Sequence, residues 1–227
     1  MISDSTLEAS SDASFSSVLD GHPEPSACSD LNQCHHRISN NRMAKIYYVI
    51  GPSGAGKDTL LDAIRSAYPQ DIIVAHRYIT RPFGAGGENH VAVSESEYLS
   101  RQQKGLFAMS WQAHGLYYGV GVEVNTWLDK GFSVLLNGSR AELAQAQRCF
   151  GESLVPVLVN VRLEVLRARL QQRGRESAQE IERRLRRAVE YSLSGDPSYH
   201  QIDNSGDINS SVAQFSQIRC QVEGVQP

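Results

Sequence analysis

A glycine-rich loop that ends in a lysine is the part of this chain best suited to chemistry. Residues 45–59 read KIYYVIGPSGAGKDT. The apolar run at residues 46–50 predicts a buried strand, and the apolar positions within residues 60–64 have helical spacing. A strand, a glycine-rich loop and a helix in this order are typical of a phosphate-binding loop.

Such a loop holds phosphates with backbone N–H groups and with the positive end of the following helix. Lys57 adds a full positive charge where negative charge accumulates during phosphoryl transfer. The alternative is a tight turn without a ligand, but three glycines and a lysine would then cost stability for no packing gain. The residues predicted to bind ATP are Gly51, Pro52, Ser53, Gly54, Ala55, Gly56, Lys57, Asp58 and Thr59.

Asp58 occupies the position where such loops usually have a Ser or Thr that binds Mg²⁺. A carboxylate beside phosphates is repelled unless a cation lies between them. We therefore expect Asp58 to face Mg²⁺, directly or through a water molecule. The alternative is that Asp58 only caps the helix, whose N-terminus favours a negative charge.

Composition indicates an ordinary globular enzyme with no membrane or nucleic-acid partner. The 227 residues include 22 Lys and Arg against 25 Asp and Glu, a net charge of −3. This balance does not favour nucleic acid or a membrane surface, and no apolar run has the length of a membrane span. The chain shows no secretory signal and no disulfide spacing among its four cysteines, so we expect a cytoplasmic location and reduced thiols.

Residues 1–42 differ from the rest of the chain. They are rich in Ser, Asp and Asn and have few periodic apolar positions. Such a segment cannot bury enough surface to offset the entropy lost on ordering. We predict a disordered extension over residues 1–42 and one folded domain over residues 43–227.

Strands and helices alternate through the predicted domain. This alternation predicts an α/β fold with a parallel, doubly wound sheet and flanking helices. A region of short strands rich in aromatic residues predicts a small subdomain. Beyond the loop, the predicted strands are residues 71–80, short strands within 106–121, 132–136, 154–161 and a short strand near 200–203, and the predicted helices are 94–104, 122–130, 140–150, 163–173, 178–193 and one from 208.

Arginines gather where a phosphoryl-transfer site would need cations. Arg77 and Arg81 lie at the end of the second predicted strand, where ligand sites of α/β sheets form. Residues 162–187 contain nine arginines and only four acids. Arg173 and Arg175 flank Gly174 and are placed to belong to a mobile lid. Many of the others could belong to a solvated helix face, with surface ion pairs at i,i+4 spacing such as Glu180–Arg184.

The sequence contains no convincing general base. A hydroxyl acceptor usually needs one, whereas a phosphate acceptor is already an anion and needs only neutralising charge and positioning. Abundant arginine without a base therefore favours phosphorylation of a phosphate. His90 and His114 remain candidates for acceptor contacts, although a single His in a loop more often lies at the surface or forms hydrogen bonds.

Several short segments together carry a resemblance to a known family. The segments are GPSGAGKD, ITRP at residues 79–82, GGENH at 86–90, SWQAHGLYYGVG at 110–121, NGSR at 137–140 and RGRE at 173–176. From Lys45 to the last helix, the chain closely resembles the ribose 1,5-bisphosphate phosphokinases, relatives of guanylate kinase with a P-loop NTPase fold. A loop ending in Gly-Lys-Asp is itself typical of that family.

The resemblance implies a reaction and roles for individual residues. ATP would phosphorylate ribose 1,5-bisphosphate to 5-phosphoribosyl 1-diphosphate (PRPP), in PRPP supply and phosphonate breakdown. Lys57 would stabilise the transferring group, Arg81 would hold the acceptor phosphate, and Arg173 and Arg184 would act from an arginine-rich lid. Asp203 and Asn204 resemble a loop near the adenine, and the acceptor contacts would come from Arg77, Arg81, Glu88, His90 and His114. The oligomeric state is left open.

Two other functions remain as alternatives. Guanylate kinase would need a second arginine after Arg81 and an Asp-Tyr pair, where this chain has Asn89 and His90, so only Glu88 of the GMP-reading set is present. Asn137 also replaces an acid expected after the third strand. The second alternative is a binding module without catalysis, which would usually have a degraded phosphate loop.

Overall fold

A computed structural model describes residues 43–85, 88–192 and 198–225. The extension predicted for residues 1–42 lies outside the described residues. Among the residues that are described, no helix is both long enough and apolar enough to cross a membrane.

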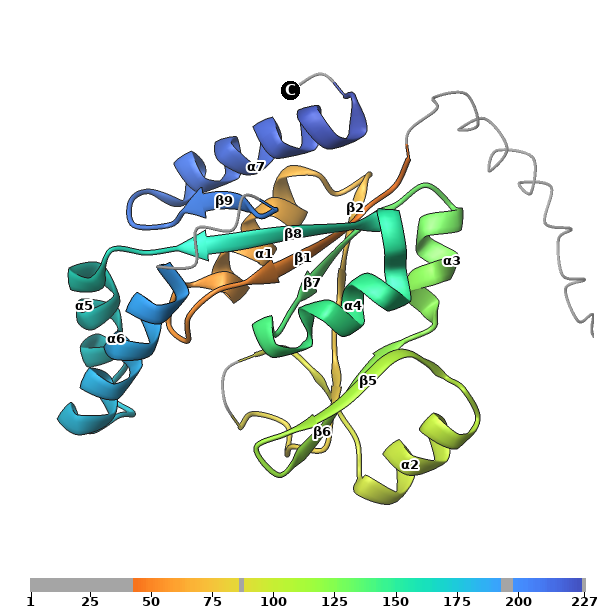
Figure 1. The fold of residues 1–227 in the computed structure, drawn as a ribbon, viewed down its shortest axis with the longest axis horizontal. Coiled ribbons are helices and arrows are strands. Elements are labelled where there is room, and N and C mark those ends of the chain that lie inside the picture. The colour runs from red at the N-terminus through yellow and green to blue at the C-terminus, as the bar shows by residue number, and fades with distance from the viewer. Residues whose placement is uncertain (1–42, 86–87, 193–197, 226–227) are drawn as a thin grey trace, which may run out of the picture. The chain divides into compact units, whose positions relative to one another are not determined.

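The elements follow one another as the alternating pattern predicts, with strands of the main sheet separated by helices (Figure 1). The strands are β1 Ile46–Ile50, β2 Ile72–Ala75, β3 Tyr78–Ile79, β4 Val91–Ala92, β5 Phe107–Ala113, β6 Leu116–Gly121, β7 Ser133–Asn137, β8 Leu154–Asn160 and β9 His200–Asp203. The helices are α1 Lys57–Ala67, α2 Glu95–Gln103, α3 Glu123–Asp129, α4 Leu143–Phe150, α5 Leu163–Arg173, α6 Ala178–Ser192 and α7 Ile208–Glu223, with 3₁₀ turns at Arg140–Glu142 and Gly151–Ser153.

The main sheet has the order β2-β7-β1-β8-β9, and every neighbouring pair is parallel. This confirms the predicted parallel, doubly wound α/β fold. Strand β1 is the middle strand of this sheet. The glycine-rich loop that follows it therefore lies at the centre of the carboxyl edge, where such sheets bind ligands.

Side chains of β1 alternate between two apolar cores, one on each face of the sheet. Tyr47 and Val49 pack in the core that contains residues of α1, α5, α6 and α7. Ile46, Tyr48 and Ile50 pack in the core that contains residues of α3, α4, β5 and β6. All five residues are almost completely buried. This two-sided burial fixes β1, and with it the start of the loop.

A second, mixed sheet with the order β4-β3-β6-β5 forms the small subdomain. Strand β3 pairs antiparallel with β6 and parallel with β4. The prediction of one strand over residues 71–80 was wrong, because the chain leaves the main sheet after Ala75 and enters the second sheet at Tyr78. The extended sequence pattern continues through the change of sheet and cannot reveal it. Strand β4 was not predicted either.

Two helix ends carry residues that are typical of caps. Ser94 caps α2 and accepts a hydrogen bond from the Glu97 N–H, at 3.1 Å. Gly174 ends α5 in a left-handed conformation, with φ of 64°. The break between α5 and α6 is therefore a direct consequence of the glycine in the arginine-rich segment.

A buried polar cluster attaches α7 to the main sheet. The Glu223 carboxylate accepts hydrogen bonds from Tyr47 Oη at 2.8 Å and Ser133 Oγ at 2.6 Å, and it pairs with Arg219 Nε at 3.0 Å. Arg219 also pairs with Asp71 at 3.2 Å. Burial raises the pKa of Tyr47, and the charge of Glu223 raises it further, so the hydroxyl remains a donor.

We expect Glu223→Ala to destabilise the fold by about 3 kcal/mol, because it leaves a buried guanidinium and a buried hydroxyl without their main partner. Glu164→Ala is a matched control, since the Glu164 side chain is 70% exposed and pairs only with exposed Arg162. The control should lose less than about 1 kcal/mol. Urea unfolding followed by circular dichroism measures both values. Equal stability of the two variants would contradict the role assigned to the cluster.

Candidate active site

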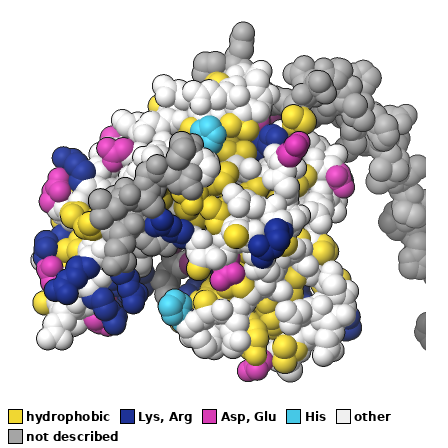
Figure 2. All heavy atoms as spheres, viewed as in Figure 1, with side chains coloured by type: hydrophobic (Ala, Val, Ile, Leu, Met, Phe, Trp, Pro, Cys, Tyr) yellow, Lys and Arg dark blue, Asp and Glu magenta, His cyan; other side chains and the backbone are white. Residues whose placement is uncertain are grey.

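A cavity of about 910 Å³ opens between the phosphate loop, the small subdomain and the two arginine-rich helices. Eight arginines and Lys57 contribute to its wall, whereas Asp58 and Glu88 are the only acids among the described residues that line it. Figure 2 shows Lys and Arg side chains gathered over α5 and α6. The cavity is therefore a site for strongly anionic ligands. The lining arginines are Arg77, Arg81, Arg169, Arg173, Arg175, Arg183, Arg184 and Arg187.

The phosphate loop needs glycine at two positions for different reasons. Gly56, which precedes α1, has φ of 82°, and a Cβ there would lie 2.8 Å from Asn204 Nδ2. A Cβ on Gly51 would lie 2.6 Å from the Val159 carbonyl oxygen of the neighbouring strand β8. Glycine is thus required for both the turn and the close approach of backbones.

Lys57 is the first residue of α1, and its ammonium turns back onto the loop. Lys57 Nζ donates hydrogen bonds to the carbonyl oxygens of Gly51 at 2.9 Å and Pro52 at 3.3 Å. Desolvation lowers the pKa of this ammonium, and the charge of Arg77 acts in the same direction, while Asp58 opposes both. An anionic ligand beside Lys57 would favour its charged form, so the loop is built to gain from a bound phosphate.

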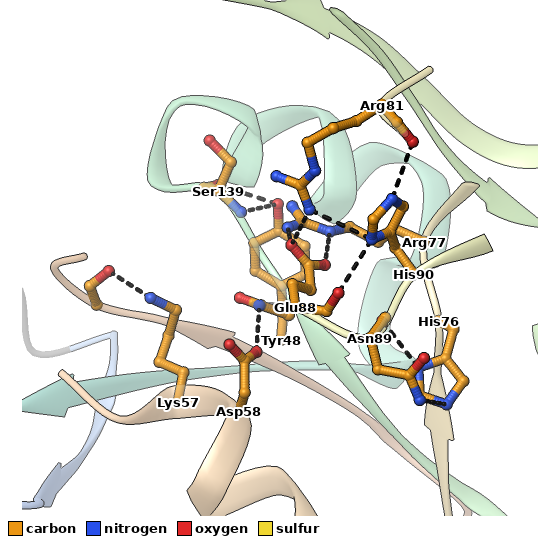
Figure 3. A network of polar contacts seen from close by, with 12 residues as sticks. Tyr48, Lys57, Asp58, His76, Arg77, Arg81, Glu88, Asn89, His90 and Ser139 are labelled. Carbon is orange, nitrogen blue, oxygen red and sulfur yellow. Dashed lines mark hydrogen bonds and ion pairs between the residues drawn. The ribbon is translucent and has the colours of Figure 1, made fainter. Parts of the chain in front are cut away.

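Asp58 lies next to the end of β7, where Asn137 Nδ2 donates a hydrogen bond to its Oδ1 at 3.0 Å (Figure 3). Desolvation raises the pKa of Asp58, and the charge of Glu88 raises it further. Thr59 also lines the cavity. Carboxylate, amide and hydroxyl oxygens are the hard ligands that Mg²⁺ prefers.

No group of three or more His, Cys, Asp or Glu residues that could hold a metal ion is found in the described part of the chain. This fits Mg²⁺, which proteins usually bind through one or two carboxylates together with substrate phosphates. The residues present therefore suit an ion that arrives with a nucleotide rather than a preformed metal centre.

The segment that follows β9 supports the phosphate loop through hydrogen bonds. Asn204 is buried, and its Nδ2 donates to the Ala55 carbonyl oxygen at 2.7 Å. Arg169 of α5 donates to the same carbonyl at 3.2 Å and to the Asn204 carbonyl oxygen at 2.9 Å. Ala55 itself does not line the cavity. Its carbonyl instead joins the loop to α5 and to the β9–α7 turn.

Arg184 connects the helix α6 to the tip of the phosphate loop. Its Nη1 donates to Ser53 Oγ at 2.7 Å, and its Nη2 lies 3.2 Å from Glu176 Oε1. The alternative of a surface pair between Arg184 and Glu180 is not what the structure shows, because Glu176 is the acid that pairs with Arg184. The Glu176 side chain is only 6% exposed, and its buried Oε2 has no hydrogen-bond partner among the described residues. Glu176 was not predicted as a site residue, because its role depends on the fold of the turn.

In the part of the cavity that the small subdomain forms, Arg77 lies between β2 and β3, at the point where the chain changes sheets. It binds the Glu88 carboxylate at both oxygens, with Nε–Oε1 at 2.8 Å and Nη2–Oε2 at 2.5 Å (Figure 3). Its guanidinium also lies over Trp111 and Tyr118, 5.8 and 5.3 Å from the ring centroids. Both aromatic residues lie in the segment at residues 110–121 that resembles the known family, but the sequence did not predict a role for either of them.

Arg81 and His90 support each other beside this pair. Arg81 Nη2 lies 3.6 Å from Glu88 Oε2 and 3.4 Å from His90 Nδ1. The His90 ring lies 3.0 Å from the Glu88 carbonyl oxygen and 3.1 Å from the Arg81 carbonyl oxygen. His90 is buried and does not line the cavity, whereas Arg81 does. His90 is therefore placed to position Arg81 and Glu88 rather than to contact a ligand.

The remaining predicted site residues lie at the cavity wall. Arg173 of α5 lines it, and so does His114, which is exposed in the turn between β5 and β6. Asp203 lies outside the wall; its neighbour Asn204 braces the loop. The fold thus brings nearly all the predicted residues to one cavity, and it adds Trp111, Tyr118, Asn137 and Arg169.

Comparison with known proteins agrees with this arrangement. The family model described as guanylate kinase matches residues 43–218. The ribose 1,5-bisphosphate phosphokinase PhnN of Yersinia pestis is 48% identical over 176 residues, which cover 78% of this chain and 91% of the relative. The protein of the same name from Enterobacter lignolyticus is 51% identical over 171 residues, covering 75% and 89%.

Among solved structures, guanylate kinase from Anaplasma phagocytophilum superposes with a TM-score of 0.59 at 21% sequence identity. The match covers 82% of this chain and 89% of that protein. At this identity the likeness shows a shared fold and carries no information about the substrate.

We expect Lys57→Ala to reduce phosphoryl transfer from ATP by about 100-fold or more, because it removes a fixed cation from the transferring group. Lys104→Ala is the matched control, since Lys104 follows α2 and does not line the cavity. A coupled assay of ADP release measures turnover, and circular dichroism checks the fold. Unchanged turnover in a folded Lys57→Ala variant would contradict the role of this lysine.

Proposed function

This chain belongs to the guanylate kinase family, and from that membership we propose that it phosphorylates ribose 1,5-bisphosphate with ATP to give PRPP and ADP. Its similarity to proteins named ribose 1,5-bisphosphate phosphokinase supports this proposal. ATP is the co-substrate, phosphorylated ribose is the acceptor, and the cytoplasm is the proposed location.

The excess of cations over available bases in the cavity wall carries the proposal. Both oxygens of Glu88 are engaged by Arg77, and Asp58 lies at the phosphate loop beside Lys57. These are the only two acids that line the cavity in the described part of the chain. A hydroxyl acceptor would need a proton acceptor. An acceptor phosphate needs only cations, which this cavity has in excess.

In the proposed reaction, an oxygen of the acceptor 1-phosphate forms a bond to the γ-phosphorus of ATP. The bond between this phosphorus and the oxygen that bridges to the β-phosphate breaks, and ADP leaves with that oxygen. Lys57 and the loop N–H groups hold the donor phosphates. Arg81 holds the acceptor phosphate, and Arg173 and Arg184 neutralise charge from the lid side.

Mg²⁺ belongs to this proposal as the partner of the ATP phosphates. Asp58 would hold it, with Thr59 and Asn137 close by, and the ion would supply positive charge at the β- and γ-phosphate oxygens. Without a cation, the Asp58 carboxylate would repel the same phosphates. The hydrogen bond from Asn137 Nδ2 restrains this carboxylate at the end of β7.

The alternatives receive less support from the site. A GMP acceptor would need hydrogen-bonding groups for a base, and the one candidate that the chain retains, Glu88, is engaged by Arg77. A non-catalytic binding module would have no need of a lysine held at a glycine-rich loop beside a cluster of arginines.

We expect ³¹P NMR to detect a new diphosphate when the protein is incubated with Mg-ATP and ribose 1,5-bisphosphate, because the product carries a phosphoanhydride at its 1-position. A parallel sample with GMP should show little GDP. Efficient turnover of GMP alone would contradict the proposed acceptor. Turnover of neither acceptor would support the binding module.

We expect Asp58→Asn to raise the Mg²⁺ concentration that gives half-maximal rate by about 10-fold or more, because the variant loses a charged ligand or its water bridge. The pKa of Asp58 is raised, so in the unmodified protein the Mg²⁺ requirement should increase as the pH falls and the carboxyl is protonated. The variant should lack this pH dependence.

Asp62→Asn is the matched control for Asp58→Asn, because Asp62 lies one turn later on α1 and its side chain is 65% exposed. Its Mg²⁺ requirement should match that of the unmodified protein. The metal role would be wrong if Asp58→Asn kept both the original Mg²⁺ requirement and its pH dependence.

A further inference from the structure

Arg77 contacts the side chains that would otherwise be available to bind a nucleobase. Trp111 and Tyr118 stand opposite each other on β5 and β6, and their rings stack with centroids 5.3 Å apart and planes at 9°. The Arg77 guanidinium lies over this stack, and the same guanidinium binds the nearby Glu88 carboxylate. A flat aromatic face and a carboxylate are what a purine would need for stacking and for its N–H donors.

The position of Arg77 is strongly determined. Its side chain is 11% exposed, and that of Glu88 is 14% exposed. Two parallel hydrogen bonds fix the plane of the guanidinium, and the two rings fix its face. A ligand would have to break both sets of contacts to displace it. The space over the aromatic stack therefore belongs to Arg77 and is closed to a base.

The same guanidinium keeps donors for an anion. Two of its five N–H groups reach Glu88, and its Nη1 has no hydrogen-bond partner among the described residues. Arg81 Nε, close by, is buried and also lacks a partner there. A buried donor without a partner, such as Arg81 Nε, is costly, and a bound anion would satisfy it and would also accept from Arg77 Nη1. Arg77 thus forms a second cationic position, apart from the phosphate loop, and Arg81 lies beside it, where it can hold the acceptor phosphate.

We infer that Arg77 selects the acceptor by replacing a nucleobase site with a site for the second phosphate, the 5-phosphate, of the sugar bisphosphate. This inference rests on the proposed function and assigns its specificity to a single residue. Glu88 and the Trp111–Tyr118 stack position Arg77. The 1-phosphate, which receives the new group, is held by other cations of the cavity.

The test compares ligands that each carry one of the two phosphates. Ribose 5-phosphate and ribose 1-phosphate serve as competitive inhibitors against ribose 1,5-bisphosphate, with the unmodified protein and with Arg77→Met. The variant should lose about 100-fold in kcat/KM for the bisphosphate and in affinity for ribose 5-phosphate, the usual size for a lost, desolvated charge contact. Its affinity for ribose 1-phosphate should change less than about 3-fold, because that phosphate binds elsewhere. GMP should inhibit the variant at least as well as the unmodified protein.

Two further variants control for structural effects. Arg101→Met removes another arginine that lies over an aromatic ring, Tyr78, and pairs with a carboxylate, Glu97, but outside the cavity wall. It should leave every constant within about 2-fold. Arg77→Met combined with Glu88→Gln avoids an unpaired carboxylate and should show the same selective loss, and thermal unfolding checks that each variant is folded.

Equal losses for both monophosphates in Arg77→Met would make Arg77 a general support of the site and would overturn the inference. No loss for ribose 5-phosphate would also overturn it. In both cases turnover of the bisphosphate by the unmodified protein would leave the proposed function intact. If the unmodified protein failed to phosphorylate the bisphosphate, the proposed function itself would fail, and the inference with it.

Discussion

Repulsion between like charges is the constraint that shapes this site. Eight arginines and one lysine lie around a single cavity that contains two lining acids, and such crowding is unfavourable unless each cation is held. The fold holds several of the arginines with carboxylates: Arg77 and Arg81 with Glu88, and Arg184 with Glu176. It holds others with carbonyl oxygens of the phosphate loop. A ligand rich in phosphate can provide better partners than these carbonyls, so the positive charge gathered around the cavity also favours binding of such a ligand.

Both sheets contribute residues to the wall of this cavity. The central strand of the parallel sheet leads into the phosphate loop, and the mixed sheet contributes Trp111 and Tyr118 to the opposite part of the same cavity wall, where we propose that the acceptor binds. The link between them is two residues long, His76 and Arg77, between β2 and β3. Because the chain changes sheets there, Arg77 is fixed by backbone on both sides and faces the cavity from the junction. The position of the acceptor cation thus follows from the topology itself.

Sequence patterns were sufficient for features that depend on near neighbours in the chain. The loop at residues 51–58, the caps at Ser94 and Gly174 and the buried strands could all be predicted from local spacing. Features set by distant contacts could not. The break after Ala75 depends on which strands pair with each half of the segment, and no local signal marks it. The partner of Arg184 is a second example, because helical spacing offers Glu180 as an alternative while the turn before α6 brings Glu176 closer.

Glu88 illustrates why a single matching residue is weak evidence about a substrate. In the sequence it reads as a remnant of a GMP site, since it is the one acid of that set that the chain retains. In the structure both of its oxygens are bound by Arg77, eleven positions earlier. A carboxylate bound in this way neutralises and orients a cation, and fewer of its lone pairs remain to accept hydrogen bonds from a base. The identity of residue 77 therefore decides what Glu88 does. A retained acid can support a phosphate site as readily as a base site, depending on the residue that faces it across the fold.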